Sequence, residues 1–153
     1  MDDFCKKLVE DFMNYKQLTA PCGRDCFNCP LYLAKEDENL KSFFVQKYNL
    51  EKEKVGCDGC RSIEGKCYFL QNLGFSEQCK IYKCINGKKL DFCFECKDFP
   101  CDLLHPLADR ADIFPHNLKV FNLCLIKRLG VDNWAKDKAK KSFDKYYKDK
   151  IDL

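Results

Sequence analysis

Apolar residues recur at spacings of three or four in several stretches of the chain, which is the pattern of an amphipathic helix. This pattern predicts helices over residues 3–18, 36–48 and 117–129. In the last of them the apolar stripe consists of Leu118, Phe121, Leu125 and Leu129. No strand-turn-strand pattern is strong and no repeat of solenoid length is present. The sequence therefore predicts a mainly α fold with few or short strands.

Glycine, proline and aspartate suggest where the remaining helices begin and end. Pro100 suits the first turn of a short helix, and Gly130 can close the helix that precedes it in a left-handed cap. Asp132 can cap a last helix that contains Trp134. Between residues 69 and 84 we expect one or two short helical turns, which Gly87 then interrupts.

The middle of the chain has a different composition. Of the 13 cysteines in 153 residues, all but Cys5 and Cys124 fall between Cys22 and Cys101, in a polar and lysine-rich segment. Such a segment buries little apolar surface and usually needs disulfides or metals to fold. We expect a single domain over residues 1–153, with an N-terminal helix (1–20), an irregular, metal-stabilised cysteine-rich region (21–104) and C-terminal helices (105–153).

Metal thiolates are favoured over disulfides by the expected compartment. The first residues are acidic and resemble no secretory signal, and no apolar run approaches the ~20 residues of a membrane span. We therefore expect a cytoplasmic protein with no membrane contact, in a compartment where thiols stay reduced. The odd number of cysteines also fits a complete disulfide framework poorly.

The cysteine spacings are those of metal sites. The segment contains a C-x3-C-x2-C motif, two C-x2-C pairs, a C-x4-C pair and a cysteine that follows Pro100. Close pairs of this kind bind zinc in tetrahedral sites, whereas three cysteines in the first motif could also hold a [4Fe–4S] cluster. The candidate ligands are Cys22, Cys26, Cys29, Cys57, Cys60, Cys79, Cys84, Cys93, Cys96 and Cys101.

The grouping of these ligands is only partly predicted. We expect the three cysteines of the first motif to share one centre, with Cys101 as the fourth ligand by elimination. The other six would share the remaining metal. Six thiols do not divide into four-cysteine sites, so either one pair is free or Cys67 and His105 join them. Zinc is preferred, with an iron–sulfur cluster as the alternative. Cys5 and Cys124 lie beside apolar helix faces and are expected to be buried thiols that bind no metal.

The runs "APCGRDCFNCPLY", "CDGC", "CKIYKC" and "CFECKDFPCDLL" resemble an uncharacterised cysteine-rich family of bacteria and archaea, catalogued as a domain of unknown function. The resemblance extends roughly over residues 19–134. It implies metal binding, with zinc favoured, by the ten cysteines just named, and it implies no activity. Cys67 has no counterpart among the family motifs, and Tyr82 stands where the family usually has an arginine.

Charge and motifs restrict the class of function further. The net charge is +3 with the signs interspersed, which disfavours nucleic acid as a partner. We find no nucleophile–base pair and no phosphate-binding glycine loop, so a non-enzyme is slightly favoured over an enzyme. The sequence predicts a small metal-binding protein whose surface serves a protein partner. The alternative is an iron–sulfur protein, either an electron carrier or an enzyme with an open cluster iron.

Overall fold

The computed structural model describes residues 13–104 and 117–148. Within these ranges the regular structure is helical, joined by loops and turns, and an isolated antiparallel bridge links Thr19 to Asp25, which confirms the predicted fold class. The α-helices are α2 (Pro30–Leu33), α3 (Glu38–Tyr48), α4 (Tyr68–Asn72), α5 (Lys80–Lys88), α6 (Leu118–Leu129), α7 (Val131–Trp134) and α8 (Lys140–Lys148). Short 3-10 turns are η1 (Cys26–Asn28), η2 (Lys52–Lys54), η3 (Cys93–Glu95) and η4 (Asp102–Leu104).

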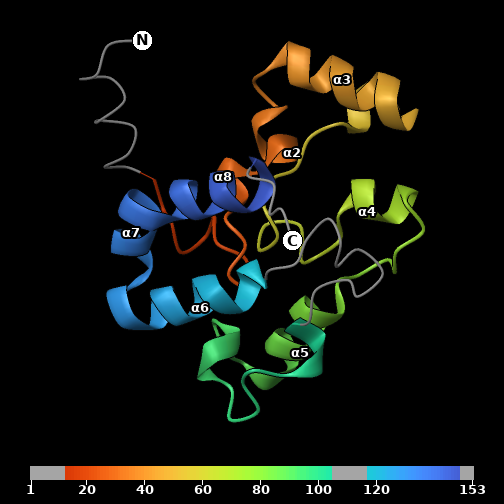
Figure 1. Cartoon of the computed structure of the whole chain (residues 1–153). Coiled ribbons are helices and arrows are strands. Elements are labelled where there is room, and N and C mark those ends of the chain that lie inside the picture. The colour runs from red at the N-terminus through yellow and green to blue at the C-terminus, as the bar shows by residue number, and fades with distance from the viewer. Residues whose placement is uncertain (1–12, 105–116, 149–153) are drawn as a thin grey trace, which may run out of the picture.

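The C-terminal helices form one side of the molecule. A π-helical turn, η6 (Ala135–Ala139), joins α7 to α8, and the resulting long helix lies beside α6 (Figure 1). Between them lies the C-terminal cluster, whose buried members are Tyr15, Ile126, Trp134, Ala135 and Ala139. α3 and α5 lie at opposite ends of the remaining structure (Figure 1).

Two further clusters hold the cysteine-rich region together. The central cluster contains the buried residues Ala20, Cys22, Cys26, Ile81, Ile85, Phe92, Cys93, Leu104 and Leu123. The α3 cluster contains the buried residues Leu31, Ala34, Phe44, Leu50 and Val55. Cysteines pack in or against both clusters, so the apolar core and the candidate metal ligands occupy the same space.

Side-chain caps explain where α3 and α6 begin. Asp37 accepts hydrogen bonds from the backbone N–H groups of Asn39 (2.9 Å) and Leu40 (3.0 Å), and Asn49 ends α3 in a left-handed conformation. Asn117 caps α6 by accepting from the N–H of Val120 at 3.2 Å. The helices expected over 36–48 and 117–129 are thereby confirmed.

Several local predictions were wrong. Gly87 lies inside α5, which continues to Lys88, because a glycine with helical φ interrupts no hydrogen bond. Gly130, not Asp132, is the N-cap of α7, and Asp132 lies in its first turn. Cys124 is exposed, because α6 turns a different face to the core. Of the expected N-terminal helix, residues 15–18 form a turn, while its residues 3–12 and Cys5 lie outside the described residues.

Candidate metal centre

The structure divides the cysteines between Cys22 and Cys101 into three groups. All twelve described cysteines are free thiols. The pocket group consists of Cys84, Cys93, Cys96 and Cys101, which line one cavity. The inner group consists of Cys22, Cys26, Cys60 and Cys79, which lie in or against the central cluster. The outer group consists of Cys29, Cys57 and Cys67, which pack against the α3 cluster.

Three segments build the cavity of the pocket group. Cys84 comes from α5, Cys93 begins η3, and Cys96 follows that 3-10 turn. Cys101 immediately precedes η4. The turn between the two middle cysteines is closed by the N–H of Cys96, which donates to the carbonyl oxygen of Cys93 at 3.1 Å. This tight turn brings both side chains to the same side of the chain.

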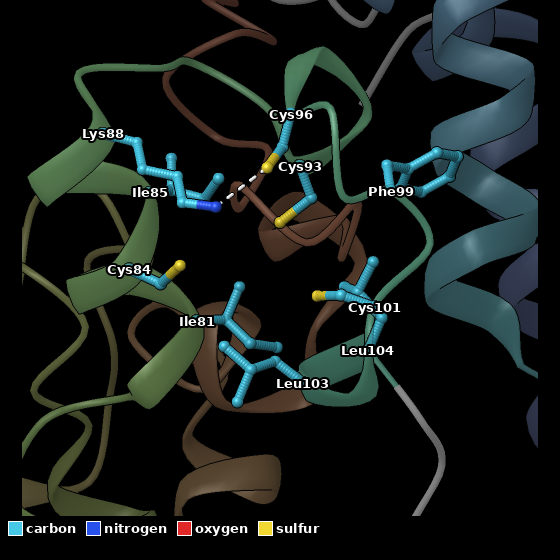
Figure 2. Close-up of a pocket in the computed structure, with 10 residues that line it drawn as sticks. All are labelled: Ile81, Cys84, Ile85, Lys88, Cys93, Cys96, Phe99, Cys101, Leu103 and Leu104. Atoms are coloured by element: carbon cyan, nitrogen blue, oxygen red, sulfur yellow. Dashed lines mark hydrogen bonds between the residues drawn. The ribbon is translucent and has the colours of Figure 1, made fainter.

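The four sulfurs of the pocket group point into one shared space (Figure 2). The cavity measures about 20 Å³, which is room for roughly one water molecule or one ion and excludes an organic substrate. Its other walls are almost entirely apolar and come from Ile81, Ile85, Phe99, Leu103 and Leu104. A set of thiols converging inside apolar walls is the chemistry that suits a soft, thiolate-binding cation such as zinc.

A lysine stands at the edge of this cavity. Lys88 Nζ donates to Cys96 Sγ at 3.0 Å and to Asp98 Oδ2 at 3.0 Å (Figure 2 draws the first). Hydrogen bonds to these two partners raise the pKa of Lys88, so its ammonium group stays charged. Burial, with the neighbouring Cys22 and other thiols, raises the pKa of Cys93 to about 12. The Cys93 thiol is therefore neutral near pH 7 unless a cation stabilises its thiolate.

Two members of the inner group, Cys26 and Cys60, are hydrogen-bonded to each other. The backbone N–H of Cys60 donates to Cys26 Sγ at 3.5 Å, across 34 positions of the chain. The hydrogen bond from the Cys60 thiol lowers the pKa of Cys26 to about 7, and the same contact raises the pKa of Cys60. The Cys26 and Cys60 side chains thus lie close together although they belong to different sequence motifs.

The outer group contains the second contact of this kind. The hydrogen bond from Cys57 lowers the pKa of Cys67 to about 6, and this contact raises the pKa of Cys57. The backbone N–H of Gly59 also donates to Cys57 Sγ, at 3.4 Å. Cys67 stands alone in the sequence, where no spacing assigns it to a pair, and the fold brings it to Cys57.

These groups differ from the grouping expected from spacing. The structure brings Cys101 to the pocket group, and it places Cys29 against the α3 cluster while Cys22 and Cys26 belong to the central cluster. His105 lies outside the described residues. As the side chains stand, no three His, Cys, Asp or Glu residues in ranges 13–104 and 117–148 are close enough together to hold a metal ion.

Fold and thiol groups together define a helical, cysteine-rich protein whose cysteines form part of its core. The family model described as "Protein of unknown function (DUF3795)" matches residues 18–106, more than half of the chain, and the chain belongs to this family. Searches of the curated proteins and of the solved structures found no significant match. Within the described part of the chain, no helix combines the length and apolar character that crossing a bilayer requires.

Proposed function

We propose that this protein binds zinc through the pocket group and uses the metal to hold its cysteine-rich region in shape. The observation that carries the proposal is the convergence of four cysteine side chains, from three segments, on one small apolar cavity. Four thiolates are the ligand set of closed structural zinc sites. Zinc would hold the four sulfurs at about 2.3 Å from the ion.

The charge of the site supports this assignment. Zinc stabilises the thiolate form of its cysteine ligands, which offsets the cost of ionising deeply placed thiols such as Cys93. Four thiolates around a dication leave a net negative charge, and Lys88 places an ammonium group beside one of these sulfurs. A side chain that donates a hydrogen bond to a metal ligand orients this ligand and tunes its affinity for the metal.

A closed four-thiolate site has no free coordination position, so it supports a structural role and not a catalytic one. The site would stabilise the region from α5 to η4. The segment that precedes α5 in the chain carries exposed apolar side chains. Leu70, Leu73 and Phe75 are each at least 40% exposed on α4 and the loop that follows it. Apolar side chains gathered at a surface are typical of protein contacts, which supports a protein partner.

The first test is metal analysis of protein purified without oxygen. We expect zinc in the wild type, about one equivalent less in Cys84→Ser and in Cys96→Ser, and no change in Cys124→Ser. Cys124 is exposed on α6 and is a matched control for thiol loss. Full zinc content in both pocket variants would overturn the proposal. If the purified protein is brown and absorbs visible light, the bound group is an iron–sulfur cluster and not zinc, because zinc is colourless.

A further inference from the structure

The geometry points to a second zinc site, built by the inner group: Cys22, Cys26, Cys60 and Cys79. The inference rests on the proposed function only in taking zinc as the metal. It assigns these four cysteines to one ion and leaves the outer group, Cys29, Cys57 and Cys67, without metal. The grouping expected from the sequence instead joins Cys22, Cys26 and Cys29 with Cys101. A further alternative would combine the sequence pairs Cys26–Cys29 and Cys57–Cys60 in one site.

The first link joins Cys26 to Cys60. The backbone N–H of Cys60 points at Cys26 Sγ from 3.5 Å, as backbone N–H groups do toward metal-bound thiolates. Gly59 permits this approach, because its φ is +90° and a Cβ added there would lie 3.6 Å from Cys26 Cβ and 3.8 Å from its sulfur. The two residues therefore meet through a glycine that lies directly against the Cys26 side chain.

The second link joins Cys60 to Cys79 through Gly65. The N–H of Gly65 donates to the carbonyl oxygen of Cys60 at 2.8 Å, and the N–H of Cys79 donates to the carbonyl oxygen of Gly65 at 3.0 Å. A Cβ added at Gly65 would lie 3.3 Å from Cys79 Cβ and 2.7 Å from Tyr82 Cβ. This packing fixes the start of α5 against the turn that follows Cys60.

The third link brings in Cys22. Its side chain is 8% exposed and lies in the central cluster, against which Cys60 and Cys79 also pack. Cys22 lies near enough to Cys79 and Cys60 for these thiols to influence one another's pKa, and the same holds for Cys93 of the pocket group. Four cysteines from three separated segments thus gather around the same part of the core.

The side chains of the outer group pack against the α3 cluster and not against the central cluster. Cys57 and Cys67 are hydrogen-bonded to each other, and both pack with Cys29 against the α3 cluster. Although Cys57 and Cys60 are only three positions apart, one faces Cys67 and the other faces Cys26. Each sulfur of this C-x2-C pair thus has its main partner outside the pair, although Cys57 still lies near enough to influence the pKa of Cys60.

Zinc stoichiometry of single serine variants tests this grouping. We expect about two equivalents in the wild type and about one in Cys60→Ser and Cys79→Ser. The matched controls Cys57→Ser and Cys29→Ser should keep both. Loss of an equivalent from Cys29→Ser and Cys57→Ser, with none from Cys79→Ser, would overturn the inference in favour of the sequence pairs. The pocket variant Cys84→Ser reports on the proposed function separately, because it removes the other ion.

Alkylation of the unmutated protein keeps the inference testable if a variant does not fold. Zinc-loaded full-length protein is treated with iodoacetamide and mapped by mass spectrometry, with and without a strong chelator. Cys22, Cys26, Cys60 and Cys79 should gain reactivity at least tenfold on chelation, as the pocket group does, because zinc-bound thiolates are shielded. An equal gain at Cys29, Cys57 and Cys67 would contradict the grouping, as would no gain at Cys60 and Cys79.

Discussion

Asn122 of α6 donates a hydrogen bond from Nδ2 to the carbonyl oxygen of Gly23 at 2.8 Å, across 99 positions of the chain. Both residues are buried, and Asn122 is completely inaccessible to solvent. A buried carbonyl needs a donor, because leaving it unpaired costs free energy. This contact therefore fastens the loop of the first cysteine motif to the C-terminal helices.

Replacing Asn122 by alanine should lower the free energy of unfolding by about 2 to 3 kcal/mol, since the Gly23 carbonyl loses its donor and a cavity forms. Urea denaturation measures the change. The matched control is Asn133→Ala, which removes a hydrogen bond to the Leu129 carbonyl on an exposed surface. That variant should stay within about 0.5 kcal/mol of wild type. Equal losses would mean that the Asn122 contact carries no special weight.

Gly23 itself should tolerate no side chain. Its φ is +80°, and an added Cβ would lie 3.0 Å from Leu123 Cγ and 3.1 Å from the Lys119 carbonyl oxygen. Gly23→Ala should cost about 2 to 3 kcal/mol, from backbone strain plus this contact. Gly74 has nearly the same φ, +82°, but an added Cβ meets nothing within 4 Å. Gly74→Ala should cost only the strain of the positive φ, about 1 kcal/mol, and thermal unfolding of both variants separates the two terms. If both variants lose the same stability, the close contact of the added Cβ at Gly23 contributes nothing.

Gly87 offers a change in the opposite direction. It lies in α5 with a helical φ, and a Cβ added there meets nothing within 4 Å. Gly87→Ala should therefore stabilise the protein by about 0.5 to 1 kcal/mol, because alanine loses less entropy than glycine on folding. Gly74→Ala is the control, since that site is equally open but has a φ of +82° and should be destabilised. A lower melting temperature for Gly87→Ala would show that α5 does not continue through this residue.

The limits of α6 follow from the sequence, but its buried face does not. Apolar spacing predicts residues 117–129 correctly, yet the buried positions are Leu118, Asn122, Leu123 and Ile126, and Phe121 is 54% exposed. The reason is the hydrogen bond from Asn122, a polar residue that periodicity assigns to solvent. Once this residue faces the core, the helix turns so that Cys124 faces water. Asn122 is buried because it hydrogen-bonds to the carbonyl of Gly23, which is distant in sequence, and a pattern of apolar residues cannot predict such a contact.

For the cysteines, too, the sequence predicts one part of the arrangement and not the other. Spacing identifies the candidate ligands, because the turns of close pairs are local. Which pairs meet depends on how α5 lies against the loop of Cys22, and this depends on contacts such as that of Gly65 with Tyr82. Cys67 stands alone in the sequence, so only the fold brings it to Cys57.

Lys88 should matter for the affinity of the pocket group for zinc. Lys88→Met removes the ammonium group beside Cys96 and should weaken zinc binding about tenfold, as loss of an outer-shell partner does. A competition titration with a coloured chelator measures the affinity. Lys83→Met is the matched control, because Lys83 is exposed on the same helix and the net charge changes equally. The same loss in both variants would assign the effect to net charge and not to the hydrogen bond.

Removal of metal should loosen the cysteine-rich region before the C-terminal helices. After chelation, amides from Cys22 to Cys101 should exchange faster, because the low apolar content of this region does not offset its chain entropy. Trp134, the single tryptophan, is fully buried in the C-terminal cluster and reports on that part. Its emission should stay blue-shifted until urea is added. Unchanged exchange in the cysteine-rich region would contradict this expectation, and an early red shift of Trp134 would show that both parts unfold together.

The pocket group and the inner group span different lengths of the chain, and this difference affects the order in which they form during synthesis. All residues of the pocket group lie in one short stretch, so its cysteines can meet as soon as Cys101 has left the ribosome, at a low cost in loop closure. The inner group closes a longer loop, from Cys22 to Cys79, and Asn122 secures that loop only when α6 follows. The nascent chain therefore completes its most local thiol group early and waits for its C-terminal third before the first cysteine motif is held in place.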